Sequence, residues 1–161
     1  LAVLHDADRE ERIRREMRML ARAVGQSGDA VLITDARGII EYVNPAFEAS
    51  TGYRFDEAVG RPSSLLNSGR HNPEFFDRLW ETIRKGDVFR AVFTNRRKDG
   101  AIFFEEKTIS PIRNANGSIT HYVSTAKDVT ERVEAEARQD AASGRPGERR
   151  CRRGRRYLPR R

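Results

Sequence analysis

The sequence is poor in cysteine and lacks long hydrophobic runs. Cys151 is the only cysteine of the 161 residues, so no disulfide can form within the chain. No apolar run approaches the roughly 18 residues that indicate a membrane-spanning helix. Both absences favour a cytoplasmic protein that does not insert directly into a membrane.

Excess positive charge is confined to the C-terminal end. Residues 141–161 hold nine Arg and one Glu, so this tail carries +8, whereas the whole chain carries +7. Residues 1–140 therefore carry −1 and lack the basic surface typical of domains that bind nucleic acid. The tail has almost no apolar residues, so we predict a disordered Arg-rich tail and no nucleic-acid partner. An arm that binds RNA or DNA is the alternative for this segment.

The first 24 residues are dense in Arg and Glu and predict an amphipathic N-terminal helix over residues 1–24. Four of its apolar residues are spaced four, three and four positions apart, as in a coiled-coil seam. We therefore predict that this helix dimerises the protein. A helix that packs against its own domain would show the same periodicity and is the alternative. The seam consists of Ile13, Met17, Leu20 and Val24.

Short apolar runs separated by turn residues predict a domain over residues 25–128. Asp99-Gly100 lies between two such runs and predicts a hairpin with a type I′ turn, in which both residues have positive φ. Asn44-Pro45 ends one strand and begins a helix, because Asn can cap and Pro fits the first turn. We expect strands at about 30–34, 39–43, 88–97, 101–112 and 118–128, a long helix over 73–85 and a last helix over 129–140.

These motifs, in this order, resemble a PAS sensory domain. The resemblance rests on residues 29–47, on Thr51-Gly52-Tyr53, on residues 95–100 and on the string from Asp128 through Thr130 to Arg132. It implies an α+β fold, with a five-stranded antiparallel sheet in the order 2-1-5-4-3 and short helices on one face. It also implies an input module in which Asp128 and Thr130 relay a signal into the helix at 129–140.

Within this family, Ser68-Gly69-Arg70-His71 and the segment 95–100 are most similar to PAS domains of bacterial sensor kinases and cyclic-di-GMP enzymes. We therefore expect a homodimer and a C-terminal output domain, a kinase or a cyclic-di-GMP enzyme, in the parent protein. Flavin-binding redox and aerotaxis sensors share much of the pattern. That likeness implies FAD as the first candidate cofactor.

Five residues are candidates for contacting a planar cofactor. Strand alternation places Phe89 and Asn95 on one face, and the Asn amide can both donate to and accept from a heterocycle edge. An Asn that only bonds backbone near the hairpin end is the alternative. Phe103 and Glu105 share a face of the partner strand, where a buried carboxylate needs a hydrogen bond or a cation at the rim. The candidate set is Trp80, Phe89, Asn95, Phe103 and Glu105.

Other cofactors of the family match the sequence less well. The photoreactive FMN subclass needs a thiol, and Ser63 occupies the aligned position, while Ala126 aligns with its flavin-sensing Gln. Haem-binding PAS domains need a His on the long helix, and residues 73–85 contain none. We therefore disfavour photoreactive FMN and haem, although Phe89 also departs from the Trp usual in FAD sensors.

The sequence predicts no catalytic site and no metal site. Glu105 and Glu106 are a carboxylate pair, but neighbours on a strand point to opposite faces and cannot act together on one substrate. No phosphate-binding loop, His/Cys cluster or Ser/His/Asp arrangement is present. We predict a non-catalytic sensory and dimerisation module. A PAS scaffold without ligand, used for protein–protein interaction, is the alternative.

Overall fold

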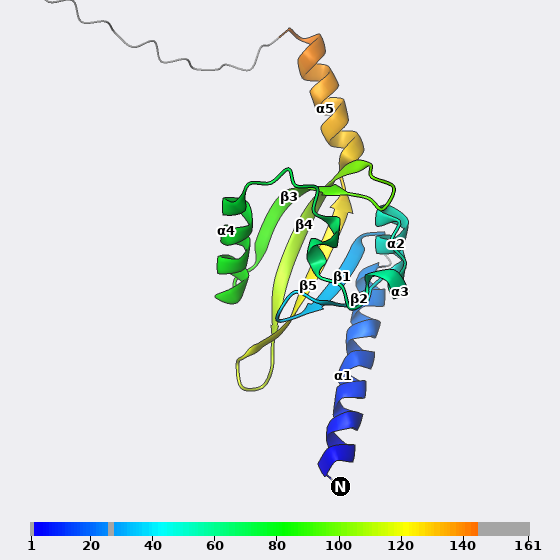
Figure 1. Cartoon of the computed structure of the whole chain (residues 1–161), viewed down its shortest axis with the longest axis vertical. Helices are drawn as coiled ribbons and strands as arrows, with labels where there is room; N and C mark the ends of the chain where they lie inside the picture. Colours follow the sequence, from blue (N-terminus) through cyan, green and yellow to red (C-terminus); the bar gives the residue numbers. More distant parts are fainter. Residues whose placement is uncertain (1, 26–27, 145–161) are drawn as a thin grey trace, which may run out of the picture. The chain divides into compact units, whose positions relative to one another are not determined.

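A single antiparallel sheet forms the centre of the computed structural model, which describes residues 2–25 and 28–144. Its five strands lie in the order β2-β1-β5-β4-β3 (Figure 1), which confirms the predicted α+β architecture. Helices α2 and α3 lie beside β1 and β2, whereas α4 lies beside β3 and β4. The strands are β1 (Ala30–Asp35), β2 (Ile40–Val43), β3 (Phe89–Arg96), β4 (Ile102–Arg113) and β5 (Ile119–Asp128). The helices are α1 (Ala2–Gly25), α2 (Pro45–Thr51), α3 (Phe55–Ala58), η1 (Ser63–Leu66), α4 (Pro73–Arg84) and α5 (Thr130–Ala142).

The hairpin between β3 and β4 is present, but its turn is not of type I′. Gly100 has φ +92°, whereas no described residue other than glycine has positive φ. The Arg97 N–H donates to the Ala101 carbonyl at 2.8 Å, and the Gly100 N–H donates to the Arg97 carbonyl at 2.9 Å. The loop is therefore one residue longer than predicted, and only its last position requires glycine.

Asparagine caps fix the starts of the two helices that flank the sheet. The Asn44 Oδ1 atom accepts from the Phe47 N–H at 2.9 Å at the start of α2, and also from the Val31 N–H of β1 at 2.8 Å. The Asn72 Oδ1 atom accepts from the Phe75 N–H at 3.0 Å at the start of α4. Each cap precedes a proline in the first turn, as the sequence predicts for Asn44-Pro45.

Helix α1 packs one side against the outer face of the sheet. Ala21 is buried there, and it forms a cluster with Val31 and Ile33 of β1, with Met17 packed against it. Leu20 is 67% exposed and Ile13 is 41% exposed, so part of the predicted seam faces away from the domain. The side chain of Val24 and residues 145–161 of the predicted tail lie outside the described residues. Dimerisation through this seam stays a prediction.

The chain separates into a first unit, residues 1–130, and a second unit that begins at Glu131. Within the second unit, none of the described α5 side chains is buried. Across residues 2–25 and 28–144, no helix combines the length and the apolar character needed to cross a membrane.

Candidate functional site

A cavity of about 320 Å³ lies between the inner face of the sheet and the elements that cover it. That volume is at the lower end of the range for small-molecule sites. Strands β1, β3, β4 and β5 supply one wall, and α4, η1 and the turn between β1 and β2 supply the others. Its lining includes the aromatic residues Phe76, Trp80, Phe93 and Tyr122 and the polar residues Asn95, Lys107 and Ser124.

Buried polar side chains form a network at the β3–β4 end of the cavity. Glu105 is 2% exposed, and its Oε2 atom accepts from the Asn95 Nδ2 atom at 2.7 Å. The same Oε2 atom lies 3.2 Å from the Lys107 ammonium nitrogen, forming a buried ion pair. The ammonium also lies 4.9 Å from the centre of the Phe93 ring. The buried Ser124 Oγ atom of β5 has no hydrogen-bond partner among the described residues.

An aromatic wall closes the opposite side of the cavity. The rings of Trp80 and Tyr122 meet edge to face, with centroids 5.9 Å apart. Gly38, with φ +85°, lies directly against Trp80, because a Cβ at this position would be 3.0 Å from the indole Cη2 atom. This glycine is therefore needed both for the backbone conformation and for the close approach of the indole.

The segment after η1 covers the free edge of β3. The Ser68 hydroxyl donates to the Thr94 carbonyl at 2.5 Å, and the Thr94 N–H donates to His71 Nε2 at 2.8 Å. The His71 ring stacks on Phe75 with centroids 3.9 Å apart. Burial lowers the pKa of His71, which favours the neutral ring that can accept this hydrogen bond.

The junction between β5 and α5 is fastened to β4 and to the hairpin. The Asp128 Oδ1 atom accepts from the Thr130 N–H at 2.9 Å and from its hydroxyl at 2.5 Å, and Oδ2 lies 2.7 Å from Arg97 Nη2. The Phe104 N–H of β4 donates to Thr130 Oγ1 at 3.0 Å. Arg97 also donates to the Ser50 carbonyl of α2. One guanidinium therefore joins the hairpin, α2 and the junction.

The structure separates the five predicted cofactor residues into two groups. Asn95 and Trp80 line the cavity, whereas Phe89, Phe103 and Glu105 lie outside its lining. Phe89 packs among the rings of α4, and Phe103 is fully buried beneath the Arg97 guanidinium. Glu105 holds two lining residues instead of lining the cavity.

Sequence reasoning missed Lys107 and Ser124. Lys107 follows Phe103 and Glu105 at every second position of β4, so strand alternation alone would have placed it on the inner face. The Ser124 position follows in the same way from Tyr122 on β5. A lysine on a mostly buried face is unusual, and that was the available signal.

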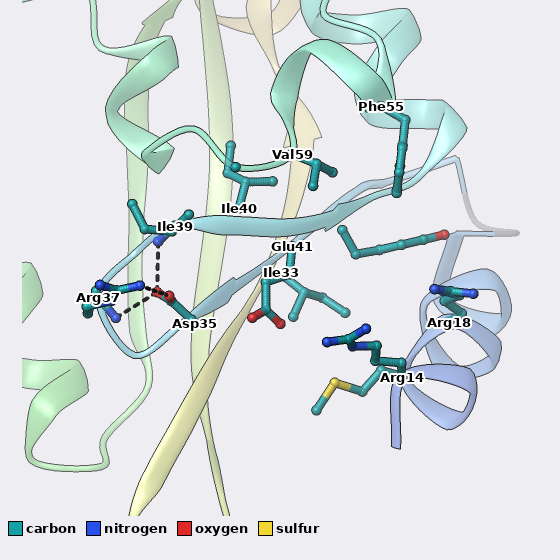
Figure 2. Close-up of a pocket in the computed structure, with 13 residues that line it drawn as sticks. Arg14, Arg18, Ile33, Asp35, Arg37, Ile39, Ile40, Glu41, Phe55 and Val59 are labelled. Atoms are coloured by element: carbon teal, nitrogen blue, oxygen red, sulfur yellow. Dashed lines mark hydrogen bonds and ion pairs between the residues drawn. The ribbon is translucent and has the colours of Figure 1, made fainter. Parts of the chain in front are cut away.

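A second hollow, of about 510 Å³, lies between α1 and the β1–β2 hairpin. Figure 2 shows Asp35 and Arg37 at one end of this hollow and Arg14 and Arg18 of α1 at the other, with Phe55 of α3 beside it. The Asp35 carboxylate accepts from the Arg37 and Ile39 backbone N–H groups at 2.8 and 3.0 Å. The three arginines are exposed, so this hollow is open to water.

Comparison with known proteins shows which family this chain belongs to. A model of the family described as PAS domain matches residues 28–131. The nitrogen fixation regulatory protein of Klebsiella oxytoca is 32% identical over 107 residues, which is 66% of this chain and 22% of that protein. The blue-light-activated histidine kinase of Brucella canis is 35% identical over 91 residues, which is 56% of this chain and 19% of that protein. The chain thus spans about a fifth of the length of these curated relatives.

A solved structure agrees with this result. The structure of an RNA-binding light-oxygen-voltage receptor is 34% identical, with a TM-score of 0.68, and the match covers 78% of this chain and 36% of that one. The expectation that ranked FAD first and disfavoured photoreactive FMN is therefore wrong, because the Brucella canis kinase is blue-light-activated and the solved structure is a light-oxygen-voltage receptor by name. That expectation relied on Ser63, in place of the thiol of photoreactive FMN domains, and on Ala126, in place of their flavin-sensing Gln. Each of these two positions concerns one step of the response to light and not the binding of the flavin. The cavity itself is formed by the fold.

Proposed function

Because this chain belongs to the PAS domain family, we propose that it is the sensory module of a signalling protein that binds FMN and responds to blue light. The observation that carries the proposal is the cavity on the inner face of the sheet, which combines aromatic walls with a polar end, in a chain whose relatives include light-responsive proteins. When bound, FMN would supply the absorption of blue light.

The residues that line the cavity fit a flavin. Its aromatic walls offer stacking surfaces for a planar ring, and the ring edges need donors and acceptors of fixed position. The Ser124 hydroxyl is a buried polar atom without a partner in the described part of the chain, which is costly unless a ligand or water satisfies it. Asn95 lies at the polar end with its amide nitrogen held by Glu105. Ser63 supplies a hydroxyl to the lining, and Trp80 forms an aromatic wall.

The relay would begin where the cavity meets the exit junction. Glu105 and Asp128 are direct partners in the β4–β5 register. The preceding residue of β4, Phe104, accepts a hydrogen bond from the Val129 N–H and donates one to the Thr130 hydroxyl oxygen. A change in ligand charge or shape at the polar end of the cavity would therefore shift the strand that holds the junction. The relay residues of the proposal are Asp128 and Thr130.

Dimerisation and output belong to the same proposal. The exposed side chains of Leu20 and Ile13 on α1 give an apolar surface for a second copy. A relative that is a histidine kinase supports a kinase as the output domain, and a cyclic-di-GMP enzyme is the other output that we propose.

FMN binding by the whole chain tests the proposal. We expect purified protein to quench FMN fluorescence at micromolar concentration and to show a structured blue absorption band that changes on illumination. Asn95→Ala should weaken binding about two- to tenfold, because it removes one hydrogen-bonding group. Asn116→Ala, in the exposed β4–β5 loop, is the matched control and should bind like the wild type. Folded wild-type protein that binds no FMN would contradict the proposal and favour a PAS scaffold without ligand.

A further inference from the structure

The cavity lining includes a charged side chain, and stacking of a planar ligand against the aromatic residues does not explain it. The Lys107 side chain is only 10% exposed, yet it belongs to the lining. A buried ion pair is seldom a net source of stability, because removing both charges from water costs about as much as their attraction returns. A contribution of the ion pair to ligand binding would explain its presence.

The two members of the pair face the cavity differently. Glu105 lies outside the lining, and its Oε2 atom is engaged by both Asn95 and Lys107. Lys107 lines the cavity and lies beside Phe93, which also lines it. A bound molecule would thus meet the ammonium end of the pair, with the carboxylate behind it.

The groups beside Lys107 strengthen this polarity. An ammonium has three donors, and the Glu105 carboxylate is its one ion-pair partner among the described residues. In the register of β4 with β5, Lys107 pairs with Ala126 and Ile109 pairs with Ser124, so the two polar residues are diagonal neighbours on the inner face. Ser124 contributes a further hydroxyl without a partner in the described residues. This side of the cavity therefore offers donors and positive charge.

We propose that Lys107 is a specificity-determining residue that makes the cavity bind reduced flavin more tightly than oxidised flavin. The inference rests on the proposed function, because it assumes that FMN is the ligand. Reduction adds two electrons and at least one proton to a flavin, so the reduced form is the richer in negative charge near neutral pH. A cation in a cavity of low dielectric attracts that form more strongly. The preference appears as a raised reduction potential of the bound flavin.

The test is the midpoint potential of FMN bound to the full chain at pH 7.5. Dithionite supplies the electrons, and a dye of known potential reports the equilibrium under anaerobic conditions. Lys107→Met should reduce the preference for the reduced form at least tenfold, which lowers a two-electron potential by about 30 mV. Lys107→Arg, which keeps the charge, should stay within about threefold of the wild type, or about 15 mV.

Two further variants keep the test decisive. Lys127→Met removes an exposed lysine from β5 and should leave the potential unchanged. Glu105→Gln combined with Lys107→Met leaves no unpaired buried carboxylate, and tests the inference even if the single variant does not fold. It should lower the potential in the same direction but by less, because the carboxylate that repels reduced flavin is removed as well. If the folded variants bind oxidised and reduced FMN less tightly by the same factor, the role of Lys107 is structural and the inference is overturned. Unchanged potentials with bound FMN would also overturn it, whereas wild-type protein that binds no FMN overturns it together with the proposed function.

Discussion

Replacing Asp128 by Asn should destabilise the first unit through the loss of the junction between β5 and α5. The Asp128 carboxylate accepts from the Thr130 N–H and hydroxyl with one oxygen and from Arg97 with the other. Burial raises the pKa of this carboxyl, but the hydrogen bonds from Thr130 and Arg97 outweigh it, so the pKa is lowered overall. The charged form is the one that the folded protein favours.

The size of the effect follows from these contacts. A capping side chain is worth about 1 kcal/mol, and Asn keeps part of that value because its carbonyl still accepts. The Arg97 and Asp128 side chains are 24% and 36% exposed, so solvent screens their ion pair to about 1 kcal/mol or less. We expect a loss of about 1 to 1.5 kcal/mol in the free energy of unfolding. For a unit that spans residues 1–130 that lowers the melting temperature by roughly 4 to 6 °C.

Urea unfolding followed by circular dichroism measures this loss at several pH values. Because the folded pKa of Asp128 lies below its unfolded value, near 3.9, the stabilisation is fully present above about pH 4. It disappears as the pH falls through the folded pKa, so the difference between wild type and Asp128→Asn should shrink below pH 4. Asp77→Asn, on the exposed face of α4, is the control. A difference below about 0.3 kcal/mol at pH 7, within the range of ordinary surface substitutions, would refute the reasoning.

Three further outcomes are expected. Gly38→Ala should lower the free energy of unfolding by about 1 kcal/mol or more, because it places a methyl group against Trp80 at positive φ, and thermal melting measures this. The free energy of unfolding should fall as the pH decreases below about 6.5, because the lowered pKa of His71 keeps the ring neutral when folded; His71→Gln should flatten that dependence in urea titrations. Leu20→Asp should reduce self-association in light scattering while Arg12→Asp, also exposed on α1, should not.

Much of the fold could be predicted because local signals agreed with one another. The Asn44-Pro45 pair marked the start of α2, and alternation marked the inner face of the strands. The turn type could not be predicted from Asp99-Gly100 alone. The same dipeptide suits a longer loop whose glycine takes the single left-handed position, and the choice depends on how β3 and β4 twist.

The site was harder to predict because strand alternation predicts which face of the sheet a side chain is on, but not whether that side chain lines the cavity. Phe103 and Asn95 are direct partners on the inner face, yet only Asn95 reaches the cavity, since Arg97 covers Phe103. Which inner residues line the cavity depends on where α4 and η1 pack. Lys107 was missed because a lysine is expected at a rim, and only the counter-charge of Glu105 permits it inside.

The contacts of the junction also limit how strong the signal can be. Under the proposed function, a ligand change that acts through Glu105 and Phe104 can alter the exit helix only by strengthening or breaking the bonds that hold Asp128 and Thr130. A ligand shifts an equilibrium by no more than its differential free energy between the two states. If those bonds are worth about 1 to 2 kcal/mol, the population at the start of α5 changes by about 5- to 30-fold. An output that responds more steeply would need a contribution from a second copy, and the exposed Ile13 and Leu20 side chains of α1 are where that contribution would enter.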